Sequence, residues 1–437
     1  MIREELVFVG VPDIAGRLRG KAFPRADLEA RLQRGVGWTP TNVQITCFDL
    51  IAESPFGPLG DLVMIPDPQA ESRVDFQDGG PADHILLGDL RELDGRPWLA
   101  CTRQLLRDAL ERLKRVSGLD ALMSFEHEFH LKGAERPHGD AYSLGGFRAQ
   151  ADFCETLIAA LRTGGLDPDT VMKEYGADQY EVTIDPKLGL RAADEAAILR
   201  EIVRGTAERY GDAASFTPLR NPAGVGNGVH IHISFRDEEG QPATYDPDAE
   251  HGMAVFTGAF IAGVLKYLDA IVAITAPSVV SYTRLTPHRW SAAFNNLGFQ
   301  DREASVRLCP ISAQEPDAIA KQFNFEYRAA DGAATPHLAL AAIIHAGVQG
   351  IEEGLPAPKA THYDLSALTP QELAAQGYIR LPQSLPEALD RFAGNATVTG
   401  WFPEGFAQLY CQHKRGELAF LRGKSMEAVC ADYEASY

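Results

Sequence analysis

The fold of this chain is decided by one stretch, Val225-Gly-Asn-Gly-Val-His-Ile-His-Ile-Ser-Phe235, in which two histidines alternate with aliphatic residues. A period of two is typical of a β-strand, so His230 and His232 share one face while the aliphatic side chains share the other. Two imidazoles on one face, directly after a glycine-rich turn, could form half of a metal site. An isolated pair of this kind more often decorates a solvated strand face, so the other strands have to decide between the two interpretations.

Composition indicates a soluble protein with a sizeable core. The chain has 437 residues and is 45% hydrophobic, which is enough for two domains. A formal net charge of -19 would repel phosphate backbones and anionic lipid, so we expect neither a nucleic acid nor a membrane as partner. The six cysteines have no metal-knuckle spacing and are expected to be buried thiols in a reducing compartment. The N-terminus lacks the apolar core of a signal peptide, and Lys266 and Asp269 interrupt the longest apolar segment, so the sequence predicts a cytoplasmic protein.

Two regions of different character divide the chain. Residues 1–96 contain short β-type runs separated by Gly, Pro and Asp turns, and these runs lie at residues 5–9, 43–47 and 61–65. After a short linker, Thr102 can cap a helix, and strands then alternate with long helices before a mostly helical C-terminal part. We therefore predict an α+β protein with domains at residues 1–96 and 97–437.

Paired polar side chains recur at a spacing of two in further strand-like stretches. The pairs are Glu126 with Glu128, Gln179 with Glu181 (preceded by Glu174), and Glu326 with Arg328. Because this spacing puts both members of a pair on one face, carboxylates from several strands are expected to crowd together. Crowded carboxylates repel one another unless cations neutralise them, and a set rich in Glu with one His suits Mg²⁺ or Mn²⁺ better than Zn²⁺. Each pair alone could be a solvated face, but together they predict a metal-lined funnel.

Basic residues accompany the predicted metal site, and they are Arg284, Arg302, Arg307 and Lys321. Cations beside a divalent metal suit phosphoryl transfer, because negative charge develops on the phosphate oxygens in the transition state. The simpler alternative for each of them is a surface salt bridge. In particular, Glu303 and Arg307 have the spacing of an ion pair on a helix.

In their order and spacing, these motifs resemble the glutamine synthetase superfamily over nearly the whole chain. The matching pieces are the ExE of Glu126 and Glu128, the E…GxxQxE-like residues 174–181, the GxGxHxHxS of residues 226–234, Ser281-Tyr-Thr-Arg-Leu285, Arg302-Glu-Ala-Ser-Val-Arg307, and residues 321–328 and 331–338. The resemblance implies a small β-grasp-like N-terminal domain and a larger catalytic domain whose curved, mainly antiparallel sheet is backed by helices. It also implies a homo-oligomer with sites between adjacent subunits, as a dodecamer of two stacked hexameric rings.

The resemblance implies two principal metal ions, Mg²⁺ or Mn²⁺, held by residues of the paired stretches. The ion nearer the glutamate substrate would be held by Glu128, Glu174 and Glu181. The ion that bridges the ATP phosphates would be held by Glu126, His230 and Glu326. All six ligand positions of the family pattern are therefore present in this chain.

The same resemblance assigns the other polar residues to the substrates. The positions that match ATP and phosphate contacts are His232, Ser234, Lys321, Arg302 and Arg307, of which Arg302 helps to neutralise the transition state. Arg284 and Arg328 match arginines that hold the carboxylate substrate and the transferring phosphoryl group, and Gly226 matches the backbone position that meets the substrate amino group. Asp49 matches the N-terminal-domain aspartate at the amine site. The implied reaction transfers the γ-phosphoryl group of ATP to glutamate, and an amine then displaces phosphate.

One departure from the family pattern bears on the amine. Glutamine synthetases carry a flap glutamate six residues after the arginine of the SYxRL motif, and this position is Trp290 here. An indole cannot accept a proton from ammonium, but it offers an apolar and cation–π surface to a larger amine. Alternatively, Trp290 packs in its loop without touching a substrate. Val225 and Val280 replace asparagines near the expected glutamate site, which leaves the carboxylate substrate open.

The sequence therefore predicts an ATP-dependent ligase that uses glutamate, ATP and an organic amine. A glutamine synthetase that uses ammonia is the first alternative, followed by a ligase for a different carboxylate. A non-catalytic relative should have lost metal ligands, which this chain retains. A metal hydrolase of the amidohydrolase kind would also use an HxH strand, but it needs further histidines on later strands, and the later histidines of this chain lie in loop-like or helical sequence.

Overall fold

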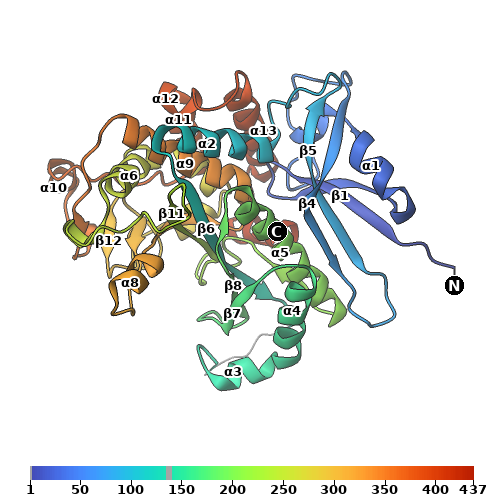
Figure 1. The fold of residues 1–437 in the computed structure, drawn as a ribbon, viewed down its shortest axis with the longest axis horizontal. Helices are drawn as coiled ribbons and strands as arrows, with labels where there is room; N and C mark the ends of the chain where they lie inside the picture. Colours follow the sequence, from blue (N-terminus) through green and yellow to red (C-terminus); the bar gives the residue numbers. More distant parts are fainter. Residues whose placement is uncertain (1, 134–139) are drawn as a thin grey trace.

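The N-terminal part of the computed structural model, which describes residues 2–133 and 140–437, is a five-stranded sheet with a short helix beside it (Figure 1). The strand order is β2 (Leu18–Pro24), β1 (Leu6–Pro12), β5 (Asp83–Glu92), β4 (Leu62–Val74) and β3 (Val36–Trp38), and the helix is α1 (Leu28–Arg34). Strands β1 and β5 are parallel, and the other neighbours are antiparallel. The predicted small α+β N-terminal unit is confirmed.

One expected strand of this region is absent. The run at residues 43–47 does not pair as a strand, because the 3-10 helix Pro40–Gln44 occupies its first half. Pro40 at the start of this helix fixes a helical φ and removes an N–H that a ladder would need. The β-type composition was therefore overridden by the proline three residues before it.

The larger part is built on a ten-stranded, mainly antiparallel sheet. Its main path runs in the order β15 (Ala360–Thr361), β12 (Leu297–Phe299), β13 (Val306–Leu308), β14 (Phe325–Asp331), β11 (Gly228–Arg236), β6 (Asp120–Leu131), β8 (Gln179–Ile184) and β7 (Pro168–Lys173). The short strands β9 (Lys187–Leu188) and β10 (Ala214–Ser215) also pair with β6. Among the described strands of this sheet, β12 is parallel to β13 and β15, and the remaining pairs are antiparallel. This is the sheet that the resemblance implied.

The register of the central strands sets the predicted site residues opposite one another. The facing pairs are His230 with Glu126, Glu128 with Glu181, and His232 with Glu326. Directly opposite residues in an antiparallel pair have Cβ atoms about 5 Å apart. Side chains from β6, β8, β11 and β14 therefore converge on one face of the sheet.

Helices back this sheet and form much of the core. Those of the larger part are α2 (Thr102–Ser117), α3 (Leu144–Ala149), α4 (Ala151–Thr163), α5 (Leu190–Arg209), α6 (Val255–Thr275), α7 (Ser281–Arg284), α8 (Pro316–Gln322), α9 (Pro336–Glu352), α10 (Pro370–Ala375), α11 (Leu385–Gly394), α12 (Ala396–Thr399), α13 (Phe406–Leu421) and α14 (Met426–Ser436). Figure 1 shows α2, α6, α9 and α11 gathered on one side of β6 and β11. Helix α6 is apolar enough to cross a membrane, but 72% of its most apolar window is buried in the protein, so it is a core helix.

A buried cluster of ion pairs joins the two parts of the chain. Arg103 of α2 lies 2.8 Å from Asp67 of β4, 2.6 Å from Asp89 of β5 and 2.9 Å from Asp194 of α5. Asp194 also lies 2.8 Å from His337 of α9. Breaking a buried pair by removing one partner costs about 3–5 kcal/mol. The cluster therefore fixes the N-terminal sheet against the helices of the larger part.

Candidate active site

Glu126 of β6 lies at the centre of a cluster of acids and histidines. Its two oxygens lie 3.0 Å from His230 Nδ1 and 3.0 Å from His232 Nε2. Burial opposes ionisation here, but the hydrogen bonds from the two imidazoles hold the pKa of Glu126 well below its usual range. His232 Nε2 also lies 3.4 Å from Glu326 Oε2, which brings the predicted ligands Glu126, His230 and Glu326 together.

Two arginines neutralise Glu326 of β14. Arg307 Nε lies 2.5 Å from Glu326 Oε1, and Arg328 Nη1 lies 2.6 Å from the same oxygen. Although burial opposes ionisation, the charges of His230 and Arg328 lower the pKa of Glu326 to about 2. The alternative that Glu303 pairs with Arg307 along a helix is wrong, because Arg307 lies on β13 and its register faces Glu326.

A second acidic group lies next to this cluster and contains Glu128, Glu174 and Glu181. Glu128 accepts hydrogen bonds from a backbone N–H of β11 at 2.7 Å and from Gln179 Nε2 at 3.1 Å. Glu174 follows β7 and accepts a hydrogen bond from the hydroxyl of Tyr142 at 2.8 Å. Glu181 faces Glu128 across the β6–β8 pair and is buried. Three carboxylates therefore lie close together, with few hydrogen-bond donors to stabilise their negative charge.

The charge balance of this second group fits a divalent cation. Burial, together with the carboxylates of Glu126 and Glu128, raises the pKa of Glu181 to about 9, and burial raises the pKa of Glu128 to about 7. Within the described ranges, the carboxylate of Glu181 has neither a hydrogen bond nor an ion pair. The ligand atom of Glu181 lies within 4.8 Å of those of Glu126 and His230 in the first cluster, a separation that one ion can span, so the two predicted ligand sets adjoin at Glu181. An oxygen-rich donor set with one imidazole suits Mg²⁺ or Mn²⁺.

A cavity of ≈ 530 Å³ opens beside the second acidic group. Among the residues lining it are Glu128, Glu174, Gly226, His230, Arg284 and Trp290, all predicted as site residues. Arg284 is buried, and its Nη2 donates to the carbonyl oxygen of Ala330 at 2.8 Å. A Cβ atom at Gly226 would lie 2.6 Å from Arg284 Cγ, so glycine at this position leaves room for the arginine.

Trp290 lies in the loop that follows α7. Its side chain is 68% exposed and lines the cavity, so it is not a packing residue of the interior. Its backbone has φ 53°, in the left-handed region. Its N–H donates a hydrogen bond to Glu303 Oε1 at 3.0 Å. The loop therefore presents the indole to the cavity and anchors it by the backbone.

Only some of the residues predicted to contact the nucleotide lie close to the acidic cluster. Ser234 lies on the same face of β11 as His232, two residues further along. Lys321 is exposed at the end of α8 and lines a separate pocket of ≈ 550 Å³ together with Arg236, which continues the same face of β11. Arg302 is exposed, and its carbonyl oxygen accepts a hydrogen bond from a neighbouring guanidinium at 3.1 Å. A line of polar residues thus leads from the acidic cluster along β11 to this outer pocket.

Asp49 lies outside the cavity of its own chain. Its side chain is 82% exposed and forms an ion pair with Arg19 at 3.1 Å. Asp49 is not among the residues that line the cavity. The next two residues, Leu50 and Ile51, are also exposed. Within one chain, therefore, the structure does not bring Asp49 to the other predicted site residues.

Tyr142 and Glu303 are among the polar residues of the site that had not been predicted as site residues from the sequence. Tyr142 lines the cavity and donates to Glu174, and Glu303 accepts hydrogen bonds from the loop of Trp290. Each contact joins segments that are separate in the chain, and neither residue lies in an alternating pattern. No local feature of the sequence marks them.

The chain matches the glutamine synthetase family along its length. Residues 99–433 match the glutamine synthetase catalytic domain, and residues 3–98 match the glutamine synthetase N-terminal domain. The chain therefore belongs to the glutamine synthetase family. It is an enzyme, an ATP-dependent carbon–nitrogen ligase of the glutamate–amine ligase family.

Individual relatives cover nearly all of the chain. It is 32% identical over 446 residues to the gamma-glutamylpolyamine synthetase GlnA3 of Streptomyces coelicolor, a match that covers 99% of this chain and 93% of that protein. A crystal structure described as a novel glutamine synthase homolog is 39% identical, with a TM-score of 0.92 and coverage of 100% of this chain and 99% of that one. A structure of GmaS in complex with ADP has the same fold, with a TM-score of 0.81 at 24% identity over 97% of this chain and 95% of that one.

Proposed function

We propose that the enzyme joins the γ-carboxylate of glutamate to an organic amine through a γ-glutamyl phosphate, with release of ADP and phosphate. The observation that carries this proposal is Trp290, an exposed indole that lines the cavity. An indole cannot accept the proton that ammonium must lose, whereas its face attracts an alkylammonium and its edge packs against an alkyl chain. The similarity to a gamma-glutamylpolyamine synthetase supports the same class of acceptor.

Two sets of residues would hold divalent cations, Mg²⁺ or Mn²⁺. The sets are Glu128, Glu174 and Glu181 on the glutamate side, and Glu126, His230 and Glu326 on the nucleotide side. When bound, the ions would neutralise the phosphate oxygens during in-line transfer. The raised pKa values of Glu128 and Glu181 support this assignment, because each carboxylate would ionise readily only beside an added positive charge.

The basic residues would act on the carboxylate and phosphoryl groups. Arg284, buried beside Gly226, would hold the substrate carboxylate, and Gly226 would meet the substrate amino group. Negative charge develops on the transferring phosphoryl group in the transition state. The guanidinium groups of Arg302, Arg307 and Arg328 would place positive charge beside it. The remaining nucleotide contacts would be His232, Ser234 and Lys321, along and beyond β11.

A homo-oligomeric ring would complete the site. Asp49 is exposed on an N-terminal loop beside exposed Leu50 and Ile51, which suits a contact with another chain. In this arrangement Asp49 of a neighbouring subunit would reach the cavity and serve as a catalytic residue for the amine. The proposed assembly is a dodecamer of two stacked hexameric rings, located in the cytoplasm.

Glutamine synthesis from ammonia is the alternative function. The cavity that holds Trp290 also contains the carboxylates of Glu128 and Glu174, and these could accept a proton from ammonium. Val225 lines the same cavity beside Gly226, where a polar residue could have gripped the glutamate, so a different carboxylate substrate remains a further alternative.

The test is phosphate release from ATP with Mg²⁺ and glutamate, across ammonia, polyamines, alkylamines, ethanolamine and aromatic amines. We expect release with an organic amine and little release with ammonia. Release of phosphate with ammonia alone would favour glutamine synthesis, and Trp290 would then have no role in binding the acceptor. If no amine supports release although ATP binds, the panel is repeated with other amino acids in place of glutamate.

A further inference from the structure

The loop that carries Trp290 has a backbone conformation that needs an external restraint. His288 has φ 62° and Trp290 has φ 53°, both in the left-handed region. Side chains with a Cβ atom disfavour this region, and two such residues in one short loop persist only where surrounding contacts hold them. The contact that holds this backbone is made by a residue outside the loop.

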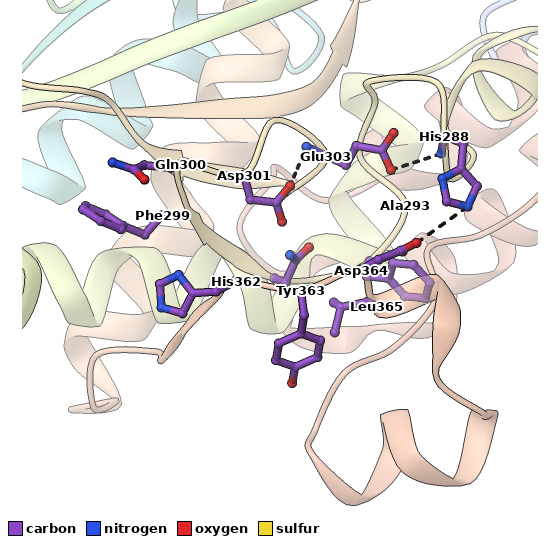
Figure 2. A pocket seen from close by; sticks show the side chains of 12 residues that line it. His288, Ala293, Phe299, Gln300, Asp301, Glu303, His362, Tyr363, Asp364 and Leu365 are labelled. Carbon is purple, nitrogen blue, oxygen red and sulfur yellow. Dashed lines mark hydrogen bonds and ion pairs between the residues drawn. The ribbon is translucent and has the colours of Figure 1, made fainter.

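Glu303 supplies this restraint with both oxygens of one carboxylate. Its Oε2 accepts the N–H of His288 at 3.0 Å, and its Oε1 accepts the N–H of Trp290 at 3.0 Å. Hydrogen bonds to a charged acceptor are stronger than those between neutral groups. Glu303 is itself held, because its N–H donates to Asp301 Oδ1 at 2.9 Å. Figure 2 shows Glu303 between Asp301 and His288, at one side of a pocket of ≈ 490 Å³.

The side chains of Arg289 and His288 make further contacts of this loop and leave these two N–H groups to Glu303. Arg289 donates to the carbonyl oxygens of Pro222 at 2.9 Å and Gly224 at 3.2 Å, just before Gly226. His288 Nε2 lies 3.7 Å from Asp364 Oδ2, on the far side of the same pocket (Figure 2). These contacts fix the ends of long side chains, whereas Glu303 fixes the backbone.

The turn that carries Glu303 also touches the phosphate side of the site. The residue before it is Arg302, whose carbonyl oxygen accepts a hydrogen bond from Arg328 Nε at 3.1 Å. Arg328 Nη2 in turn lies 3.5 Å from the carbonyl oxygen of Trp290. One short turn therefore connects the loop of Trp290 with the arginine that contacts Glu326.

We propose that Glu303 is a positioning residue for the acceptor: its carboxylate holds the 288–290 loop so that the indole of Trp290 forms one wall of the amine site. The part of this inference that concerns the amine rests on the proposed function. The part that concerns the loop stands on the two hydrogen bonds alone. The two parts are tested by separate measurements.

The first variant is Glu303→Gln, which keeps the size of the side chain. It replaces one acceptor oxygen by an NH₂ group that faces a backbone N–H, so one of the two hydrogen bonds is lost. We expect hydrogen–deuterium exchange in the peptide that covers residues 286–292 to become about tenfold faster. We expect KM for the preferred amine to rise about tenfold, while the dissociation constant for ADP changes by less than about twofold.

Two further variants serve as matched controls. Asp364→Asn removes a carboxylate from the same pocket. In the 288–290 loop Asp364 contacts only the side chain of His288, and asparagine keeps an oxygen that can accept the N–H of Ser366, so exchange and KM should stay within about twofold of the original enzyme. Glu303→Asp keeps both oxygens and the charge on a shorter side chain, and it should recover part of the loss. A charge effect on its own would make Asp364→Asn resemble Glu303→Gln.

The outcomes separate the proposal from the function on which it partly rests. Unchanged exchange in Glu303→Gln would overturn the proposal, whatever the enzyme does with amines. Faster exchange with an unchanged KM for the amine would overturn the link to the acceptor. An equal loss of ADP affinity, amine affinity and thermal stability would assign Glu303 a general structural role and would also overturn it. If no amine is a substrate, the proposed function fails while the exchange measurement still tests the loop.

Discussion

The acidic funnel and the 288–290 loop share one cavity but are held in place by different means. The funnel is the set Glu126, Glu128, Glu174, Glu181, His230 and Glu326, and five of these six lie on β6, β8, β11 and β14, whose register is fixed by backbone hydrogen bonds. The loop is held by the carboxylate of Glu303, by contacts of the Arg289 and His288 side chains, and by a long hydrogen bond from Arg328 to the carbonyl oxygen of Trp290. In the proposed function, the sheet would carry the phosphoryl chemistry, and the loop could alter the choice of acceptor without moving the acids.

The largest expected effect tests whether the funnel is the reaction centre. Glu181→Ala removes a proposed oxygen ligand, and amine-dependent phosphate release should fall by more than about 100-fold, even at saturating Mg²⁺. Glu155→Ala, an exposed glutamate of α4, is the control and should leave the rate unchanged. Retained turnover in Glu181→Ala would remove this residue from the ligand set.

A smaller effect is expected in the loop, where a substitution should redirect the enzyme. In Trp290→Glu, kcat/KM for the organic amine should fall about tenfold because the aromatic face is lost. Release with ammonia should rise, because a carboxylate in this position can accept a proton from ammonium. Trp290→Phe keeps an aromatic ring and should lose less than about threefold. If neither variant changes the ratio of the two acceptors, Trp290 does not form a wall of the amine site.

The smallest effect concerns the stability of the funnel without metal. The pKa values of Glu181, about 9, and Glu128, about 7, lie above the 4.5 expected when the chain is unfolded. Between about pH 5 and pH 9 the folded chain therefore holds more protons than the unfolded chain, and the free energy of unfolding falls as pH rises, by at most about 1.4 kcal/mol per pH unit for each group. Glu126, with its lowered pKa, titrates below this range.

This dependence is measured as Tm against pH in the presence of a chelator, and then with Mg²⁺. With the chelator, Tm should fall as pH rises above about 7. Mg²⁺ should flatten the curve, because a bound cation stabilises the ionised carboxylates. Burial lowers the pKa of several histidines, among them His127, His345 and His413, and these groups stabilise the folded chain as pH rises towards about 7. The diagnostic range is therefore about pH 7 to 9, where a Tm that rises in the chelator would mean that Glu181 is already neutralised by the protein itself.

Most of the funnel could be predicted from the sequence because its residues occur in short alternating patterns within single strands. A spacing of two places Glu126 and Glu128, or His230 and His232, on one face without knowledge of any partner strand. The pairing of strands then follows from the aliphatic residues between them, which bury the opposite face. The spacing of two residues says nothing about Lys321 and Arg302, because both are exposed and lie outside strands. Their distance from the acids could therefore not be predicted in this way.

The loop could not be predicted, because its restraint joins residues that have no common pattern. Glu303 lies 15 residues from His288 and 13 from Trp290, across β12, and its contacts run to backbone N–H groups that every residue possesses. The helical spacing of Glu303 and Arg307 even favoured a wrong partner. Asp49 is a related case, because its proposed partner would belong to another chain.

The Arg103 cluster has a consequence for how this enzyme can move and change. Because one buried guanidinium holds carboxylates from both parts of the chain, a hinge between those parts would have to expose unpaired charge. In the proposed reaction, short loops or an adjoining subunit would then have to shield the γ-glutamyl phosphate from water. A change of acceptor is therefore expected to need substitutions only at the rim of the cavity, with the two parts of the chain left in place.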